Sequence, residues 1–207
     1  MLKGDESLVF DFSVNIELTE DDFDPYCDNY FQYMESSIIL QKSSKRKKIG
    51  MIELIYLHGN RAINNNLDIV EICDSENQEL YDYSRNIYRN GRIMEKYNDL
   101  SMSDDVLVIH KVLIEKPFQG NGYGLFICKK MIDIFGSNCG GTLITPCPMQ
   151  FSIEEKERDN WNKKYLSERF DIDGEKGRIK LLKYWKQLSK YAITIKTITP
   201  NMLFIPQ

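Results

Sequence analysis

The residues whose types and spacing point most clearly to chemistry lie in one stretch of the chain, from Val106 to Gly124. An apolar, β-branched run, VLVIHKVLI, is followed by a turn with glycines at positions 120, 122 and 124, and then by a segment with helical spacing of apolar residues. Glycine allows unusual φ angles and close approach of the backbone. A strand, a glycine turn and a helix start in succession present backbone N–H groups to a phosphate. We therefore expect a phosphorylated ligand at this turn.

The residues around the turn distinguish between several kinds of phosphate site. A P-loop, G-x-x-x-x-G-K-S/T, needs a lysine and a hydroxyl residue after its last glycine, but Leu125 and Phe126 follow Gly124. A dinucleotide fingerprint, G-x-G-x-x-G, needs its third glycine one place beyond Gly124 and an acidic residue at the end of a following strand. A tight turn without a ligand also uses glycines. The P-loop is excluded, the dinucleotide site is disfavoured, and the tight turn stays as an alternative.

A third phosphate-binding interpretation comes from a resemblance to a known family. The segment from Gln119 to Gly124, QGNGYG, matches the Q/R-x-x-G-x-G/A signature of the GCN5-related N-acetyltransferases (GNAT) at every fixed position. Residues 112–114 resemble the end of the family's fourth strand, IGMIEL at 49–54 resembles its third strand, and KLLKYWKQL at 180–188 resembles its last helix. The resemblance covers about residues 8–200 and is strongest over 106–136. The chain thus resembles a member of this superfamily.

The resemblance implies a cosubstrate and the residues that bind it. In the family, acetyl-coenzyme A (acetyl-CoA) lies in the gap where the fourth and fifth strands of the sheet splay apart. By resemblance, the strand backbone pairs with the pantetheine arm like an added strand, and the N–H groups of the turn and helix start hold the pyrophosphate. The implied binding residues are Val112, Leu113, Ile114, Gln119, Gly120, Asn121, Gly122, Tyr123, Gly124 and Leu125. No metal ion is implied.

Acetyl transfer from a thioester to an amine requires that the amine lose a proton, that an oxyanion be stabilised and that a thiolate leave. His110 is the candidate base, because it lies on the predicted strand and imidazole titrates near neutrality; packing within the sheet is its alternative role. The resemblance implies an oxyanion contact from the N–H of Val112 or its neighbour, and a tyrosine acid on the last helix. Trp185 aligns with that tyrosine and has no acidic proton. Either Tyr184 therefore serves as the acid, or it is a core aromatic and the thiolate leaves unaided.

Hydrophobic periodicity predicts the elements that must position these residues. Alternation predicts strands over 8–18, 37–41, 49–57, 106–114, 141–145, 192–198 and 203–205. Helical spacing predicts helices over 21–35, 122–135 and 178–188 and one or two within 67–92, whereas 60–66 is expected to be a polar loop. This order predicts an α/β (α+β) protein with a single mixed sheet of six to seven strands flanked by helices. By resemblance, this is a GNAT-like acyl-CoA N-acyltransferase fold.

Size and composition narrow the function classes. The chain has 207 residues, 42% of them hydrophobic and 28% charged, which fits one folded domain over 1–207. Its net charge of −4 disfavours a nucleic-acid partner and favours cationic substrates such as amines. Five scattered cysteines without a C-x-x-C motif, and only two histidines, argue against zinc and favour a reducing, cytoplasmic location. No apolar run approaches the length of a membrane span.

We expect an N-acetyltransferase that moves an acetyl group from acetyl-CoA to a primary amine by direct attack within a ternary complex. Residues 106–150 would form the cosubstrate-binding core, and the N-terminal half together with 151–177 would shape the acceptor site. The alternatives are a non-catalytic acyl-CoA-binding or interaction module with the same fold, and a nucleotide-binding α/β protein. The acceptor, a small molecule or a peptide, stays open, as does a homodimer, and no membrane partner is expected.

Overall fold

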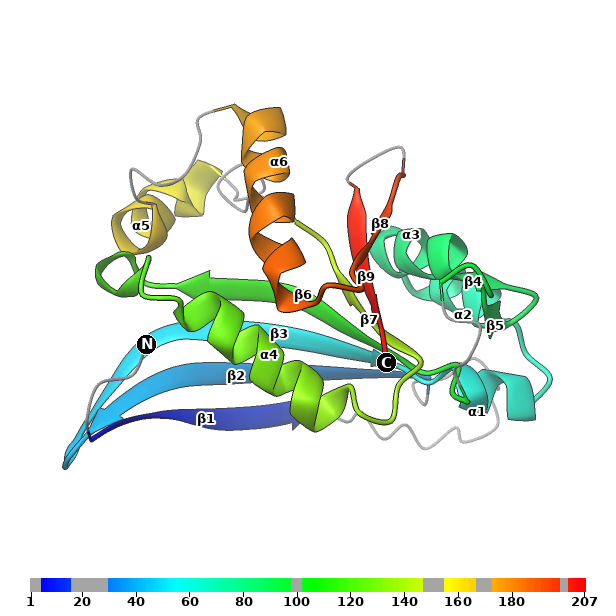
Figure 1. Ribbon diagram of the computed structural model, residues 1–207, viewed down its shortest axis with the longest axis horizontal. Helices are drawn as coiled ribbons and strands as arrows, with labels where there is room; N and C mark the ends of the chain where they lie inside the picture. Colours follow the sequence, from blue (N-terminus) through cyan, green and yellow to red (C-terminus); the bar gives the residue numbers. More distant parts are fainter. Residues whose placement is uncertain (1–4, 16–29, 98–101, 147–154, 167–172, 198–200) are drawn as a thin grey trace.

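One mixed β-sheet organises the molecule (Figure 1). The computed structural model describes residues 5–15, 30–97, 102–146, 155–166, 173–197 and 201–207. Seven strands from these segments pair in the order β1-β2-β3-β6-β7-β9-β8. Their bounds are β1 (Glu6–Asn15), β2 (Phe31–Lys42), β3 (Lys45–Leu57), β6 (Val106–Ile114), β7 (Gly141–Ile144), β8 (Ile193–Ile195) and β9 (Met202–Pro206).

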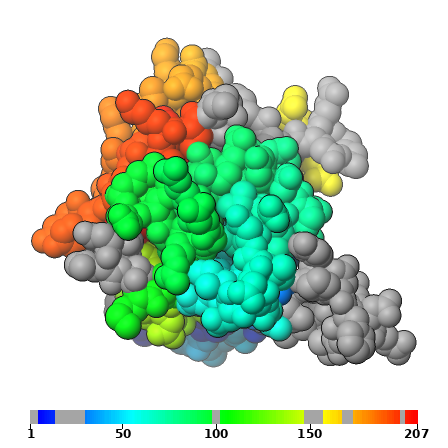
Figure 2. All heavy atoms as spheres, turned by 90° about the vertical axis from the view of Figure 1, so that its right-hand side faces the viewer, coloured from blue at the N-terminus to red at the C-terminus, as the bar shows by residue number. Residues whose placement is uncertain are grey.

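Helices cover both faces of this sheet. The helices α1 (Gly59–Asn64), α2 (Ile69–Glu76) and α3 (Gln78–Ile87) follow β3 and lead into a small hairpin of β4 (Tyr88–Arg89) and β5 (Arg92–Ile93). On the other face lies α4 (Tyr123–Phe135), with α6 (Gly174–Trp185) beside it. The helix α5 (Glu155–Tyr165) contacts the end of β6, and the 3₁₀ turns η1 (Lys116–Phe118) and η3 (Lys186–Leu188) follow β6 and α6. Figure 2 shows the surface that α1, α2 and α3 form at one end of the molecule.

The sheet has an apolar core on each face, as the side chains of β6 show. Val106 and Val108 pack with α2 and α3, whereas Leu107 and Ile109 pack with α4. All four side chains are buried. A strand that is covered on both faces needs an uninterrupted apolar sequence, which is why VLVI stands out in the chain.

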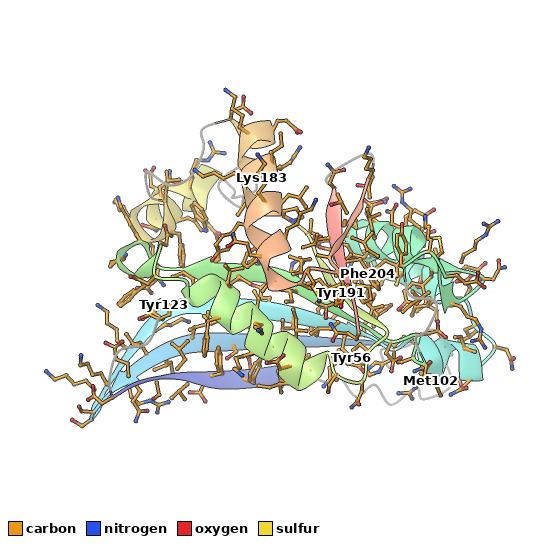
Figure 3. The ribbon with its side chains drawn as sticks, in the orientation of Figure 1. Tyr56, Met102, Tyr123, Lys183, Tyr191 and Phe204 are labelled. Carbon is orange, nitrogen blue, oxygen red and sulfur yellow. The ribbon has the colours of Figure 1, made fainter. Side chains whose placement is uncertain are left out.

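The step from β6 to β7 is parallel, and α4 forms the crossover between these two strands. The strand β7 then pairs antiparallel with β9, which pairs antiparallel with β8. β7 begins at Gly141. Only glycine fits at this position, because the ring of Phe204, labelled in Figure 3, occupies the space that a Cβ would need. The predicted strands 106–114 and 141–145 and the predicted helix 122–135 are confirmed.

The predicted fold class is confirmed. The protein is a mixed α+β structure in which helices flank a seven-stranded, mostly antiparallel sheet, an arrangement compatible with a GNAT-like fold. The helix predicted over 21–35 is wrong at its end, because residues 31–35 belong to β2, and residues 33–35 pair with both β1 and β3. Residues 21–29 lie outside the described segments.

The expected polar loop at 60–66 is also wrong, because most of it forms α1. Three hydrogen bonds of Asn60 hold the start of this helix in place. Its backbone N–H donates to Asp105, its side-chain amide donates to Ser103, and its side-chain carbonyl accepts from the N–H of Asp104. These partners lie 43 to 45 residues further along the chain. Local periodicity carries no information about such distant contacts.

Candidate functional site

The glycine turn ends in a helix start whose N-cap residue, Gly122, has no side chain with which to cap it. Gly120 and Gly122 have φ angles of 80° and 79°, which residues with a side chain rarely adopt. The first hydrogen bond of α4 runs from the Phe126 N–H to the Gly122 carbonyl at 3.1 Å. The N–H groups of residues 123–125 therefore have no partner within the helix. Because the helix dipole makes this end positive, it fits an anion.

The glycines of the turn serve different purposes. Gly120, Asn121 and Gly122 are exposed, and nothing lies within 4 Å of a Cβ built on Gly122. By contrast, a Cβ on Gly124 would lie 2.9 Å from the Tyr184 hydroxyl, so this glycine lets α6 approach α4. Tyr123, labelled in Figure 3, lies at the end of α4 nearest the turn and its side chain is buried. The turn therefore offers the predicted phosphate ligands through its backbone, with open space in front of Gly122.

Gln119 ties the glycine turn to the rest of the molecule. Its side-chain amide donates to the carbonyl of Ile114 and to the carbonyl of Tyr165, both at 2.7 Å. One side chain thus joins the end of β6 to the end of α5. The Lys47 ammonium lies 5.0 Å from the centroid of the Phe118 ring, which directly precedes Gln119. The Gln119 side chain is accordingly a support of the turn in this structure, and Lys47 adds a positive charge beside it.

Beyond residue 109, β6 is no longer paired with β7. The ladder between these strands stops at Ile109 and Ile144, although β6 continues to residue 114. A Cβ on Gly50 would overlap the Leu113 carbonyl oxygen, so this carbonyl faces β3. Because successive residues of a strand direct their N–H and C=O groups to opposite edges, the backbone of Val112 faces the other edge. That edge has the geometry that an added strand, or an extended arm with amide groups, requires.

A β-bulge places His110 where β6 and β7 separate. Glu53 of β3 pairs with Lys111 and Leu54 pairs with Ile109, so His110 is an extra residue in β6. Bulges bend a strand, re-aim its side chains and are frequent next to active sites. Here two consecutive side chains reach the same glutamate: His110 Nε2 lies 3.7 Å and Lys111 Nζ 2.6 Å from Glu53 Oε2. The bulge therefore directs His110 and its neighbour to the face of the sheet that α3 covers.

The neighbours of His110 determine which ring nitrogen carries the proton. The Tyr83 hydroxyl donates to Glu79 at 2.6 Å and lies 3.2 Å from His110 Nδ1. Because a hydroxyl has one proton and Tyr83 uses it for Glu79, His110 Nδ1 is the donor in the second contact. The lone pair of the neutral imidazole is then on Nε2, the nitrogen that faces Glu53. Held in this way, His110 is able to accept a proton at Nε2.

His110 lines a pocket of about 280 Å³ between the sheet and α3. Its size is close to the lower end of the roughly 300–1,000 Å³ that is usual for small-molecule sites. The pocket is lined by Tyr33, Met34, Glu35, Glu53, Leu54, Ile55, Asn77, Glu79, Leu80 and His110. The sequence predicts His110 as a site residue, but it does not predict the three glutamates or Tyr83. The only local signal was Glu53, a charged residue within the apolar run from 49 to 57.

Tyr184 reaches the first turn of α4 from α6. The Leu125 N–H donates to its hydroxyl, but burial has the larger effect and raises the pKa of Tyr184 above its ordinary value of 10.0. The phenol therefore keeps its proton at neutral pH. Trp185 is buried, and the centroids of its ring and the Tyr184 ring are 4.7 Å apart. The structure thus brings Tyr184 to the turn and leaves Trp185 a packing role, with Tyr184 and His110 on opposite faces of the sheet.

No protein-family model, curated protein or solved structure matches this chain. In the segments that the structure describes, no group of three or more His, Cys, Asp or Glu side chains is arranged to hold a metal ion. Among the helices of these segments, none combines the length and the apolar character that crossing a lipid bilayer requires. The geometry of β6 and its neighbours is therefore the basis for a functional proposal, and the expected roles of the cosubstrate-binding and catalytic residues stay predictions.

Proposed function

We propose that the protein is a cytoplasmic N-acetyltransferase that transfers the acetyl group of acetyl-CoA to a primary amine. The observation that supports this best is a continuity in the backbone. The edge of β6 at Val112, which β7 leaves unpaired, leads through η1 into the glycine turn and the uncapped start of α4. A ligand that fits both features needs an extended arm with amide groups that ends in a diphosphate. Coenzyme A has this chemistry.

The same continuity supports an orientation for the cosubstrate. The glycine turn follows the C-terminal end of β6, so an arm that pairs with β6 from the turn points back along the strand toward His110. The acyl end then lies beside Val112 and the bulge. His110 is also part of the pocket wall, so an amine in this pocket lies next to the acyl group. Such proximity supplies much of the rate in a direct transfer.

Three groups of the chain have roles in the proposed transfer. Acetyl-CoA supplies the thioester, and His110 Nε2 accepts the proton that the attacking ammonium must lose. The Val112 N–H, on the edge of β6 that β7 leaves unpaired, donates to the oxyanion that develops as the new C–N bond forms. Tyr184 is the candidate for the proton that passes to the thiolate when the C–S bond breaks. Its hydroxyl lies at the first turn of α4, so this role requires the thiolate to come within reach of the turn.

The replacement of His110 by alanine tests this function. We expect His110→Ala to lower kcat for acetyl transfer by about 100-fold or more, the usual contribution of a positioned general base. Acetyl-CoA binding is expected to persist, because the turn lies beyond the end of β6. Thiol release with a panel of amines measures the first quantity and isothermal titration the second. His58→Ala, the replacement of the other histidine of the chain, is the control.

A wild-type protein that binds no acetyl-CoA, or a His110→Ala variant with unchanged turnover, would contradict the proposal. One observation favours a second candidate, a non-catalytic module that binds acyl-CoA or a partner. The Leu125 N–H, one of the three amides at the helix start without a partner inside α4, donates to the Tyr184 hydroxyl, and this contact holds the phenol at the turn. A phosphate at the turn would compete with this contact. Acetyl-CoA binding without transfer to any amine, in wild-type protein, would support the module.

A further inference from the structure

We infer that the acceptor is a diamine-type molecule: an amine that is acetylated beside His110 and, several bonds away, a second cation that is bound by Glu35. This inference rests on the proposed transferase function and adds the class of acceptor. It starts from the pocket at His110, whose wall combines a proton acceptor, three carboxylates and apolar side chains. The position of each of these groups in the sheet indicates which part of the ligand it would contact.

The floor of the pocket contains a like-charge pair on neighbouring strands. Glu35 of β2 is directly opposite Glu53 of β3, and Glu53 is directly opposite Lys111 of β6. Directly opposite residues have Cβ atoms about 4.5–5.5 Å apart, so two carboxylates there repel each other. One lysine thus faces two glutamates in this row. A cation in the pocket would offset the remaining negative charge.

The three glutamates of the pocket differ in their partners. Glu53 accepts from Lys111 at 2.6 Å, and Glu79 accepts from the Tyr83 hydroxyl at 2.6 Å. In the segments that the structure describes, no ion pair or side-chain hydrogen bond reaches the Glu35 carboxylate. Glu35 is exposed at the wall of the pocket, so its carboxylate is accessible to a cation of the ligand, whereas Glu53 and Glu79 are already engaged beside His110.

The separation of these groups sets the distance between the two amines. Glu35 is on β2 and His110 on β6, with β3 between them. Two inter-strand steps amount to about 10 Å. The buried side chains of Ile55 and Leu80 line the pocket as well, and they suit a methylene spacer. A short aliphatic diamine matches this order of cation site, apolar wall and proton acceptor.

The test compares putrescine, a four-carbon diamine, with butylamine, a monoamine of the same chain length. We expect wild-type protein to acetylate putrescine with a kcat/KM about fivefold higher than that for butylamine, which is the upper end for an ion pair at an exposed carboxylate. Glu35→Gln, which removes the charge and keeps the shape, is expected to bring the ratio of the two values close to one. Glu71→Gln is the matched control, because Glu71 is an exposed glutamate of α2 outside the pocket.

Each outcome decides the inference separately from the function. Acetyl transfer by wild-type protein without preference for putrescine, or a preference that Glu35→Gln leaves intact, overturns the diamine assignment while the transferase proposal stands. If no amine is acetylated, isothermal titration of putrescine into wild-type and Glu35→Gln protein replaces the rate assay. Binding that weakens about fivefold in the variant supports the cation site although the transferase proposal has failed. Absent or unchanged binding overturns the inference as well.

Discussion

The glycine turn and the pocket at His110 are both connected to β6, but opposite charges surround them. Backbone N–H groups at the start of α4 and the Lys47 ammonium surround the turn, whereas Glu35, Glu53 and Glu79 line the pocket. The first region suits an anion and the second suits a cation. This difference indicates how a single strand could bring an anionic cosubstrate and a cationic amine to one point without placing either in a repulsive field.

The two regions also differ in what they are made of. The turn consists of main chain, and its geometry depends on the φ angles of Gly120 and Gly122. The pocket consists of side chains from β2, β3, β6 and α3, which the sheet register brings together. Changes in backbone conformation should therefore affect the first region and changes in side-chain chemistry the second. Substitutions of the two kinds separate these two dependencies.

Gly122→Val is expected to have the largest effect. A branched side chain is strained by roughly 1–2 kcal/mol at positive φ, so the turn would move and its N–H groups would no longer converge. We expect acetyl-CoA binding in isothermal titration to weaken by about 100-fold, equivalent to one or two lost charge-assisted hydrogen bonds. Gly91→Val is the matched control, because Gly91 has a φ of 76° in the remote turn between β4 and β5. Equal weakening in both variants would point to general destabilisation and against a phosphate site.

The contrast between main chain and side chains explains why some features are predictable from the sequence and others are not. The strand 106–114, the glycine turn and the helix 122–135 are confirmed because each depends on local periodicity and on glycine chemistry. The bulge at His110 was not predicted, because it arises from the register between β3 and β6. Glu79 and Tyr83, the partners of His110, lie on a helix about thirty residues earlier, and only the folded structure brings them to the imidazole.

Tyr83→Phe is expected to have an intermediate effect, confined to the chemistry of the pocket. Without the hydroxyl, His110 Nδ1 loses the acceptor that keeps the lone pair on Nε2. We expect kcat to fall about tenfold, the equivalent of one hydrogen bond to a group that gains charge, with KM for acetyl-CoA unchanged. Tyr81→Phe, on the same helix, is the control, and equal losses in the two variants would contradict a positioning role for Tyr83.

The smallest expected effect is on stability at acidic pH, and it arises at His58, outside both regions. Burial lowers the pKa of His58 below its ordinary value of 6.5. The unfolded chain then binds a proton there more readily than the folded protein, so the free energy of unfolding falls as the pH drops from 6.5 through the folded pKa. Above pH 6.5 the contribution of His58 to the free energy of unfolding is fully present.

Urea denaturation at pH 7.5 and 5.5 measures this loss. We expect His58→Gln to have a weaker pH dependence of the free energy of unfolding than wild-type protein. This difference would assign part of the acid decline of stability to His58. An unchanged pH dependence of the unfolding free energy in His58→Gln would contradict the assignment.

The most direct measurement of the central claim follows the backbone N–H groups themselves. Amide resonances of ¹⁵N-labelled protein, recorded during addition of acetyl-CoA, report which main-chain donors meet the ligand. We predict the largest shifts at Val112 on the unpaired edge of β6 and at Gly120 to Leu125 around the turn, with smaller shifts on α3. Saturating acetyl-CoA that leaves these amides unmoved, or that shifts a different surface, would contradict the account.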